Sequence, residues 1–369
     1  MIKNNAQISF TELYMERSTR KSQFFEQLNK LIYWNLIEKE IRKNYQKGVG
    51  LKGQPAYSGL SLFKMLLLSH WYALSDAATE EMVKESISCM RFCGFRLEDQ
   101  IPDHTTLCRF RNELVSKKAY ERLLKKINEQ LEKHRVIVKT GVMIDASITQ
   151  SPFSPKGNPP YELLEAEELE EKSSSTEGTL RKEKTAPVVE GANKGREKKY
   201  KLIKQTPAGV DVEAKWTKKG KKYYYGYKKH LGVDKNGMVL AVHSVGANEH
   251  DSKGLKRLIP KLGAKVKEVY ADKGYQSLEN ETYLKTRGIK ARIQKKAYRN
   301  KPLSRICILF NKLISKKRWV VERTFGSMKR WFASGKARYK SLARVHAQHV
   351  MEAIAHNLYR APGIIMRSC

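Results

Sequence analysis

The sequence predicts an α/β protein in which a mixed β-sheet with flanking helices follows an all-α N-terminal region. Apolar residues recur at helical spacing through most of residues 1–135, and nothing in that region has the alternation of a strand. From residue 136 onward, short β-branched segments alternate with helical ones. With 369 residues, 40% of them hydrophobic, the chain is long enough for two domains, and we place their boundary between residues 135 and 136.

The N-terminal region is divided into helices by glycines and by Pro102. Asp103 or Thr105 is suited to cap the start of the last helix. The expected helices cover residues 24–41, 60–74, 80–92 and 106–131.

The second region begins with a buried strand over residues 136–144, which ends at Asp145. Residues 151–199 are rich in proline, then glutamate, then Ser, Thr, Gly and Lys, so we expect a low-complexity, mobile insert with room for one short acidic helix. Strands 223–233 and 238–245 follow, joined by an Asn236-Gly237 turn. Further along we expect helix 251–262, strand 266–271, helix 278–286, strand 289–293, helix 306–331 with the option of a break near Ser315, and helix 342–359.

The charge of the chain predicts a polyanionic partner. There are 72 Lys and Arg residues against 38 Asp and Glu, a formal net charge of +34. Because such an excess opposes compact folding, nucleic acid is the partner we expect, and phosphate contacts would supply the affinity. The alternative is a basic protein whose charge serves only its solubility.

Cysteines and apolar segments bear on the compartment. The five cysteines form no CxxC pair, which is typical of reduced intracellular thiols. The start of the chain lacks the apolar core of a signal peptide, and the longest apolar stretch, residues 60–74, is too short to span a bilayer. We therefore expect a cytoplasmic, nucleoid-associated protein without membrane contact.

Two predicted strands end in an aspartate, Asp145 in the segment VMIDASIT and Asp272 in VYADKGY. In open α/β sheets, functional side chains gather where strands end. Each aspartate alone is equally well explained as a helix cap. The His250-Asp251 pair also has the residue types of metal ligands, but there we expect Asn248 or Asp251 to cap a helix.

The third acid, Glu322, is isolated in a basic part of the chain. Residues 285–369 contain 22 Lys and Arg but only two acids, Glu322 and Glu352. Arg318, Glu322 and Lys329 share one helix face because four and seven residues separate them. An intrahelical salt bridge between Arg318 and Glu322 is the ordinary explanation. The other is a metal ligand that faces phosphate.

Three carboxylates in a basic environment suit the hydrolysis of a phosphodiester. The reaction needs an activated water and charge stabilisation on the attacking and leaving oxygens, which two Mg²⁺ ions roughly 4 Å apart supply. Hard oxygen ligands suit this metal better than imidazole or thiolate. We therefore take Asp145, Asp272 and Glu322 as candidate catalytic residues and metal ligands. The candidate DNA-binding residues are Arg318, Lys329, Arg323, Arg330, Arg109 and Arg111.

The segment WVVERTFGSMKRW resembles the catalytic-glutamate helix of the DDE transposases of bacterial insertion sequences, notably the insertion-sequence-5 type. In those families an Arg, the Glu and a Lys have the spacing of Arg318, Glu322 and Lys329. The related insertion-sequence-4 pattern has a Tyr where this chain has Ser315. VMIDASIT and VYADKGY resemble the segments that carry the two catalytic aspartates. YGYKKHLGVD, VGANEHDSKGL and the N-terminal helical segments are also similar to the family, whereas the insert and the chain ends are not.

The resemblance implies a ribonuclease-H-like catalytic domain over residues 136–369 and a helical DNA-binding domain over residues 1–135. It implies Mg²⁺ or Mn²⁺, two ions per site, held by Asp145, Asp272 and Glu322. It also implies binding of double-stranded DNA, at the inverted-repeat ends of an element and at the target, with strand cleavage and strand transfer. Because two ends must be joined, we expect a homodimer in the synaptic complex.

Two alternatives stay open from the sequence. One is a non-catalytic DNA-binding protein derived from a transposase. The other is a structure-specific nuclease of the same fold. A divalent-metal cleavage assay separates the first from a transposase, and strand transfer separates the second.

Overall fold

The computed structural model describes residues 19–46, 56–156, 161–165, 200–204, 209–300 and 302–367. The chain divides into two units, one comprising Met1–Pro152 with Glu213–Cys369 and the other comprising Phe153–Val212. The first unit contains the helical region together with the main sheet. The helical region and the main sheet are therefore described below as parts of one structure.

The smaller unit contains one antiparallel pair of strands, β2 (Tyr161–Glu165) and β3 (Tyr200–Lys204). The acidic helix expected in the insert is wrong for Tyr161–Glu165, because the backbone there pairs with a distant segment as a strand. Residues 166–199, where we expected a mobile segment, lie outside the described residues.

The N-terminal region is helical, as predicted, but three of the four expected helices are each divided in two. Ile32 and Tyr33 interrupt the first, the extended backbone of Ser86 interrupts the third, and Lys118, with a φ of +50°, interrupts the fourth. Asp103 caps the last pair, since its carboxylate accepts a hydrogen bond of 2.8 Å from the Thr106 N–H. The helices are α2 (Arg20–Leu31), α3 (Trp34–Arg42), α4 (Gly59–Trp71), α5 (Asp76–Glu85), α6 (Ile87–Cys93), α7 (His104–Ser116) and α8 (Ala119–Lys133).

Among the described residues, six strands form the main mixed sheet, in the order β4-β5-β1-β7-β8 with β6 paired to β5. β1 is antiparallel to β5 and parallel to β7, which in turn is parallel to β8. The predicted hairpin is confirmed, because β5 and β6 are joined by a turn in which Gly237 has a φ of +82°. The strands are β1 (Gly141–Gln150), β4 (Lys215–Lys219), β5 (Lys222–Val233), β6 (Val239–Gly246), β7 (Glu268–Ala271) and β8 (Lys290–Ile293).

Helices cover both faces of this sheet. α10 (Asp251–Leu262) lies on one face, where Leu258 and Leu262 pack close to Gly232, and α11 (Leu278–Lys285) lies beside it. α12 (Arg305–Phe332) and α13 (Leu342–Ile365) lie on the other face. Neither α12 near Ser315 nor α13 is interrupted, and α13 runs farther than the predicted residue 359.

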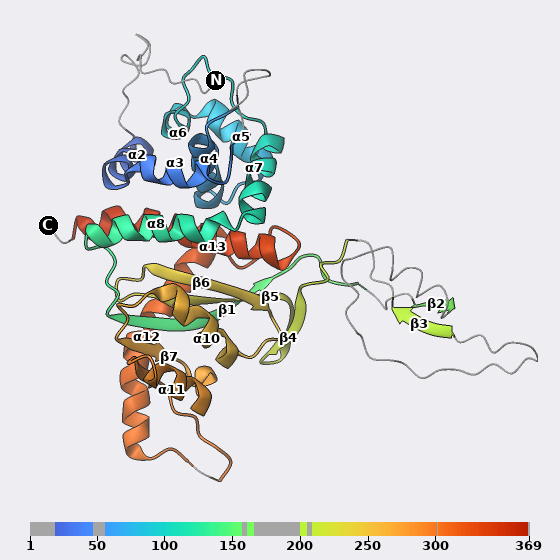
Figure 1. Ribbon diagram of the computed structural model, residues 1–369, viewed down its shortest axis with the longest axis vertical. Coiled ribbons are helices and arrows are strands. Elements are labelled where there is room, and N and C mark those ends of the chain that lie inside the picture. The colour runs from blue at the N-terminus through green and yellow to red at the C-terminus, as the bar shows by residue number, and fades with distance from the viewer. Residues whose placement is uncertain are drawn as a thin grey trace, which may run out of the picture. The chain divides into compact units, whose positions relative to one another are not determined.

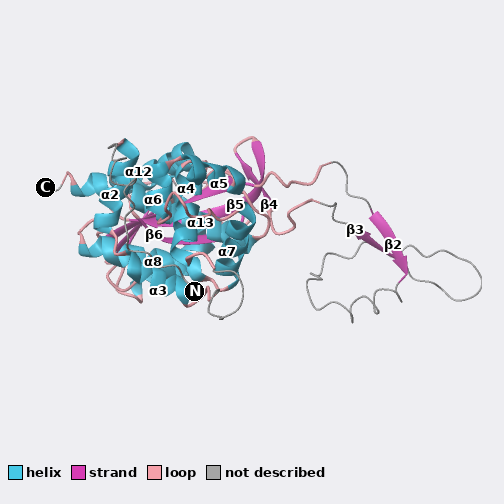
Figure 2. Ribbon diagram, turned by 90° about the horizontal axis from the view of Figure 1, so that it is seen from above, coloured by secondary structure: helices cyan, strands magenta, loops and turns pink. Residues whose placement is uncertain are grey.

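The helical region stacks on the sheet through α8 and α13 (Figure 1). Figure 2, viewed along this stack, shows the N-terminal helices and α13 superposed on the strands. Asn128 of α8 donates a hydrogen bond of 3.0 Å to the carbonyl of Val239, so the helix covers the β6 edge. A single cluster of buried apolar side chains extends from α2 to α13.

The first strand differs from the prediction in a way that affects the site. Residues 136–140 are not a strand, and the Val138 N–H instead bonds to the Asp234 carboxylate at 2.8 Å. The strand continues past Asp145 to Gln150, because residues 143–150 pair with β5. Asp145 therefore lies within β1 rather than at its end. No helix among the described residues has both the length and the apolar character needed to cross a bilayer.

Candidate active site

The register of the sheet brings the two candidate aspartates together. In the parallel pair of β1 and β7, Ile144 lies opposite Ala271, so Asp145 within β1 and Asp272 just after the end of β7 each follow a paired residue. Adjacent strands are about 4.8 Å apart. Because side chains alternate along a strand, Asp145 shares a face with Met143, the face that α12 covers, and there it meets Arg318. The two residues lie 127 positions apart in the sequence and are neighbours only because of this pairing.

Asp145 is a partly buried carboxylate with a positive partner. One oxygen lies 3.1 Å from a guanidinium nitrogen of Arg318, and the other accepts a hydrogen bond of 2.9 Å from the Ala146 N–H. Its pKa is raised to about 6, chiefly by burial and in smaller part by the charges of Asp272 and Glu322. Arg318 and the Ala146 N–H act in the opposite direction. Asp272 and Glu322 are thus close enough to act on Asp145 electrostatically.

Glu322 is the exposed member of the three. It lies on α12 four residues after Arg318, and no hydrogen bond or ion pair joins its carboxylate to any of the described residues. The intrahelical salt bridge considered from the sequence is therefore absent, because Arg318 turns to Asp145 instead. This leaves both oxygens of Glu322 available as ligands.

Asp272 caps the short 3-10 helix η1 (Lys273–Tyr275), and its carboxylate accepts a hydrogen bond from the Gly274 N–H. Tyr275 fixes this turn from below, since its buried hydroxyl lies 2.7 Å from Nδ1 of His230 on β5. Burial lowers the pKa of His230 to about 4, so the ring is neutral near pH 7. These contacts hold the backbone that carries Asp272.

A fourth acid, Asp251, lies close to Asp272. A Cβ atom on Gly274 would lie 3.4 Å from one Asp251 oxygen and 3.5 Å from an Asp272 oxygen. Asp251 begins α10, where His250 is the cap, so the expectation that Asn248 or Asp251 caps this helix is wrong. The other Asp251 oxygen pairs with Lys228 at 2.9 Å. The His250-Asp251 dipeptide was visible in the sequence, but its closeness to Asp272 depends on the fold.

The residues fit divalent metal binding in their chemistry, although they do not form a closed set of ligands. Asp145, Asp272 and Glu322 supply hard oxygen donors, and a cation would stabilise the charged form of Asp145, whose pKa is raised by burial and by the charges of Asp272 and Glu322. Within the described ranges, no three His, Cys, Asp or Glu side chains are close enough to share an ion as placed. Binding by all three carboxylates therefore requires the exposed Glu322 side chain to turn toward Asp145.

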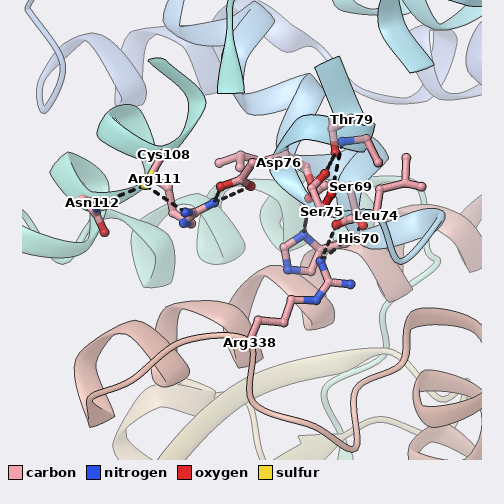
Figure 3. Close-up of polar contacts among 12 residues, drawn as sticks. Ser69, His70, Leu74, Ser75, Asp76, Thr79, Cys108, Arg111, Asn112 and Arg338 are labelled. Carbon is pink, nitrogen blue, oxygen red and sulfur yellow. Dashed lines mark hydrogen bonds and ion pairs between the residues drawn. The ribbon is translucent and has the colours of Figure 1, made fainter. Parts of the chain in front are cut away.

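Two of the six candidate DNA-binding residues are buried and already paired. Arg111 is 8% exposed and binds both Asp76 oxygens at 2.7 and 2.8 Å (Figure 3). Its guanidinium also lies over the Tyr339 ring. Arg318 is 6% exposed and faces Asp145. Their placement does not support the DNA-binding prediction, because a guanidinium that neutralises a buried carboxylate is not free to bind phosphate.

The other four candidates are exposed. Arg323 stacks on the ring of Trp319 at 4.5 Å, and Arg330 lies on the same helix. Lys329 is exposed as a residue, but partial burial of its charged end and the nearby charges of Lys229 and Lys219 lower its pKa. Arg109 lies on α7, far along the chain from the carboxylates.

A mixed sheet of this strand order, with helices on both faces, is that of a ribonuclease-H-like fold. Residues 188–358 match the transposase DDE domain family, and residues 13–113 match the transposase domain (DUF772) family. The transposase for insertion sequence element IS1106 of Neisseria meningitidis serogroup B is 32% identical over 312 residues, which cover 83% of this chain and 96% of that protein. The chain belongs to the DDE transposases of insertion sequences, as the sequence predicted. No solved structure matches it.

Proposed function

We propose that this chain is a catalytically active transposase, which binds the inverted-repeat ends of its element and cuts and rejoins DNA with Asp145, Asp272 and Glu322. One observation carries the proposal. Asp145 and Asp272 immediately follow the paired residues Ile144 and Ala271 of two parallel strands, and Asp145 faces the helix that bears Glu322, which is unpaired among the described residues. Family membership makes DNA the partner, and the net charge of +34 is consistent with it.

The three carboxylates would hold Mg²⁺ or Mn²⁺, two ions per site. Such ions, when bound, supply an activated nucleophile and stabilise charge on the attacking and leaving oxygens. Asp145 and Asp272 contribute oxygens fixed by the sheet and by η1. Glu322 contributes oxygens from a side chain that is free to turn.

The basic residues of α12 would hold the DNA at this site. Lys329, Arg323 and Arg330 are exposed on the helix that carries Glu322. Contacts of this kind position the backbone without reading sequence. The reacting phosphate would lie between these basic side chains and the carboxylates. Water would attack its phosphorus in the first step, and the freed 3′-hydroxyl would attack the target phosphorus in the second. Arg109 on α7 is the remaining exposed candidate for the helical region.

The division of labour is also part of the proposal. Residues 1–135 would recognise the element ends, and residues 136–369 would carry out the chemistry. Joining two ends in one reaction calls for a homodimer in the synaptic complex. The protein would act on DNA at the nucleoid, in the bacterial cytoplasm.

A cleavage assay tests the proposal. The purified chain is incubated with Mg²⁺ and duplexes that contain the inverted repeats flanking its gene. We expect nicking at the element end and joining to target DNA, lost by at least about a hundredfold in Asp145→Ala, Asp272→Ala and Glu322→Ala. Glu98→Ala, an exposed acid outside the site, is the matched control.

The outcomes separate the alternatives. Three variants that cleave like the wild type would show that the site is wrongly assigned. A wild-type chain that folds and binds but never cleaves would be a DNA-binding protein derived from a transposase. Cleavage without strand transfer would identify a nuclease.

A further inference from the structure

A cavity of about 590 Å³ lies on the sheet face that α12 covers, toward the start of β1 and β7. Its floor is formed by Met143 of β1 and Tyr270 of β7. Each of these residues precedes one of the two aspartates by two positions on the same strand. Two residues of strand span about 7 Å and return a side chain to the same face, so the nearest lining residues lie about 7 Å along their strands from the aspartates.

Four lysines line this cavity, and each comes from a different part of the fold. Lys235 lies in the turn between β5 and β6, and Lys267 precedes β7. Lys290 begins β8, and Lys317 lies on α12. We call these four residues and the cavity they line the lysine pocket. A solvated helix face would place its charges along one element, whereas here separate elements bring four charges to one hollow.

The positive charge of the pocket is only partly offset from within, by Glu268, whose pKa the charge of Lys290 helps to lower. All four lysines are exposed, and none forms an ion pair with any residue in the described part of the chain. Glu268 is the acid in the lining. It is already engaged, since the Tyr270 hydroxyl donates to it at 2.5 Å and Arg292 lies 3.5 Å away, and these contacts lower its pKa.

We propose that the lysine pocket binds backbone phosphates of the DNA strand that enters the carboxylate site. The inference rests on the proposed function for the presence of DNA at Asp145 and Asp272. It adds a place for the nucleotides next to the reacting phosphate, which those residues do not supply. Lysine ammonium groups act as point charges that suit phosphate oxygens, and the apolar floor of Met143 and Tyr270 suits a sugar ring.

The location explains why a separate set of cations is needed. Arg318 is buried and forms an ion pair with Asp145, so it is not free to bind phosphate. Lys329 lies twelve residues along α12 from Lys317, so the two lysines lie at different places along the helix. The exposed cations of the family segment, Lys329, Arg323 and Arg330, follow Glu322 along α12, whereas Lys317 precedes it, so the lysine pocket would extend the cationic surface on the other side of Glu322. All four pocket lysines lie outside that segment.

A salt titration of DNA binding tests this inference without any need for catalysis. Binding of a short fluorescein-labelled duplex is measured in metal-free buffer, for the wild type and for the double variant Lys267→Gln/Lys290→Gln. Loss of two phosphate contacts should lower the slope of log affinity against log salt by about 1.8, because each contact contributes about 0.9. Affinity at low salt should fall at least about tenfold.

The matched control removes the same charge from the opposite face of the sheet. Lys253 on α10 and Lys285 on α11 are exposed and unpaired within the described residues, so Lys253→Gln/Lys285→Gln serves this purpose. Thermal unfolding checks that both variants are folded. The inference stands if only the pocket variant loses slope and affinity.

Other results would overturn it or point elsewhere. Equal losses in the two variants would mean a diffuse effect of net charge, and no loss in the pocket variant would mean that the pocket does not touch DNA. The pocket would be a site for a free anion if inorganic triphosphate displaced DNA from the wild type but not from the pocket variant, while both proteins bound DNA equally well. A wild-type chain that fails to bind any duplex would contradict the proposed function rather than the pocket.

Discussion

Arg318 partly neutralises the negative charge of Asp145 in the metal-free site. Its guanidinium lies 3.1 Å from Asp145, with 6% of the residue exposed, and hydrogen-bonds to the side chain of Gln294 at 3.4 Å. It therefore occupies one oxygen of a carboxylate that is expected to bind a divalent ion. A fixed positive charge next to a metal ligand holds that ligand in place, but it also opposes the arrival of another cation.

We predict that Arg318→Gln strengthens divalent metal binding by the free protein on the order of tenfold, since about 1.4 kcal/mol of relieved repulsion gives that factor. Titration of Mn²⁺ followed by electron paramagnetic resonance measures the change. Lys316→Gln is the control, because Lys316 is exposed on the same helix and unpaired among the described residues. Weaker Mn²⁺ binding by Arg318→Gln would mean that the arginine organises the ligands rather than competing for them.

A single glycine decides how closely β5 approaches the end of β1. Gly226 lies opposite Gln150, and a Cβ atom there would lie 2.2 Å from the carbonyl oxygen of Thr149. The obstacle is backbone, so it cannot move aside without breaking the strand pair. This pairing is what extends β1 beyond Asp145.

We therefore expect Gly226→Ala to lower the free energy of unfolding by more than about 2 kcal/mol, the cost of forcing bulk into a closely packed site. Gly326 on α12 is the counterpart, because no atom lies within 4 Å of a Cβ placed there. Gly326→Ala should raise stability by about 0.5–1 kcal/mol. Urea denaturation compares the two, and similar effects of both substitutions would contradict the close approach.

At the scale of elements, the sequence predicts those whose pattern is local. The bounds of α10 are as predicted, and those of α11 and β8 differ by one residue, because their apolar periodicity ends at clear turn residues. The continuation of β1 through Ala146-Ser-Ile-Thr-Gln150 was missed, since it depends on pairing with β5. β4 was missed for the same reason, as Lys215–Lys219 is mostly exposed and becomes a strand only beside β5.

The candidate site follows the same division. Three acids could be chosen from the sequence, and in the structure the charges of Asp272 and Glu322 act on Asp145. The burial of individual side chains could not be predicted from the sequence, because it depends on how the elements pack. Arg111 and Arg318 look like exposed cations in a basic sequence, and both are buried under other elements. The lysines of the lysine pocket come from four separate segments, so no local sequence pattern predicts the pocket.

The contact between β5 and α13 depends on a buried ion pair. Lys229 and Glu352 are 0% and 1% exposed at the side chain, and their charged atoms lie 2.7 Å apart. Gln348 donates a hydrogen bond to the second Glu352 oxygen, and the Ser334 carbonyl accepts one from Lys229. Removing one partner would leave an uncompensated charge in the interior.

Lys229→Met is expected to lower the free energy of unfolding by about 3–5 kcal/mol for this reason. The double variant Lys229→Met/Glu352→Gln should lose less than the sum of the single losses, because neither charge then remains alone. Lys228→Met on the same strand controls for the loss of a lysine, since its partner Asp251 is 37% exposed at the side chain. Additive losses in the double variant would show that the pair is not coupled.

At the scale of the whole molecule, α13 joins the helical region to the sheet. The Trp71 indole on α4 donates to the carbonyl of Ala355 at 2.9 Å, and Asn357 donates to Asn128 of α8 at 2.8 Å. Arg338, just before α13, donates to the carbonyl of Leu74 at 3.1 Å (Figure 3). Most of the α13 residues are buried, although the sheet can cover only one side of the helix. The helices that precede residue 136 therefore complete the interior of the part that follows it.

This arrangement makes a prediction about the proposed boundary between residues 135 and 136. A fragment of residues 136–369 would expose the side of α13 that now packs on α4 and α8, including Ala355 and Asn357. We expect this fragment to aggregate or to lack a cooperative thermal transition, whereas the full chain should unfold the helical region and the sheet in one transition. Circular dichroism and calorimetry of both proteins measure this. A 136–369 fragment that melts cooperatively, near the midpoint of the full chain, would mean that the two regions are independent domains, and the helical region would then be free to move on the sheet when DNA binds.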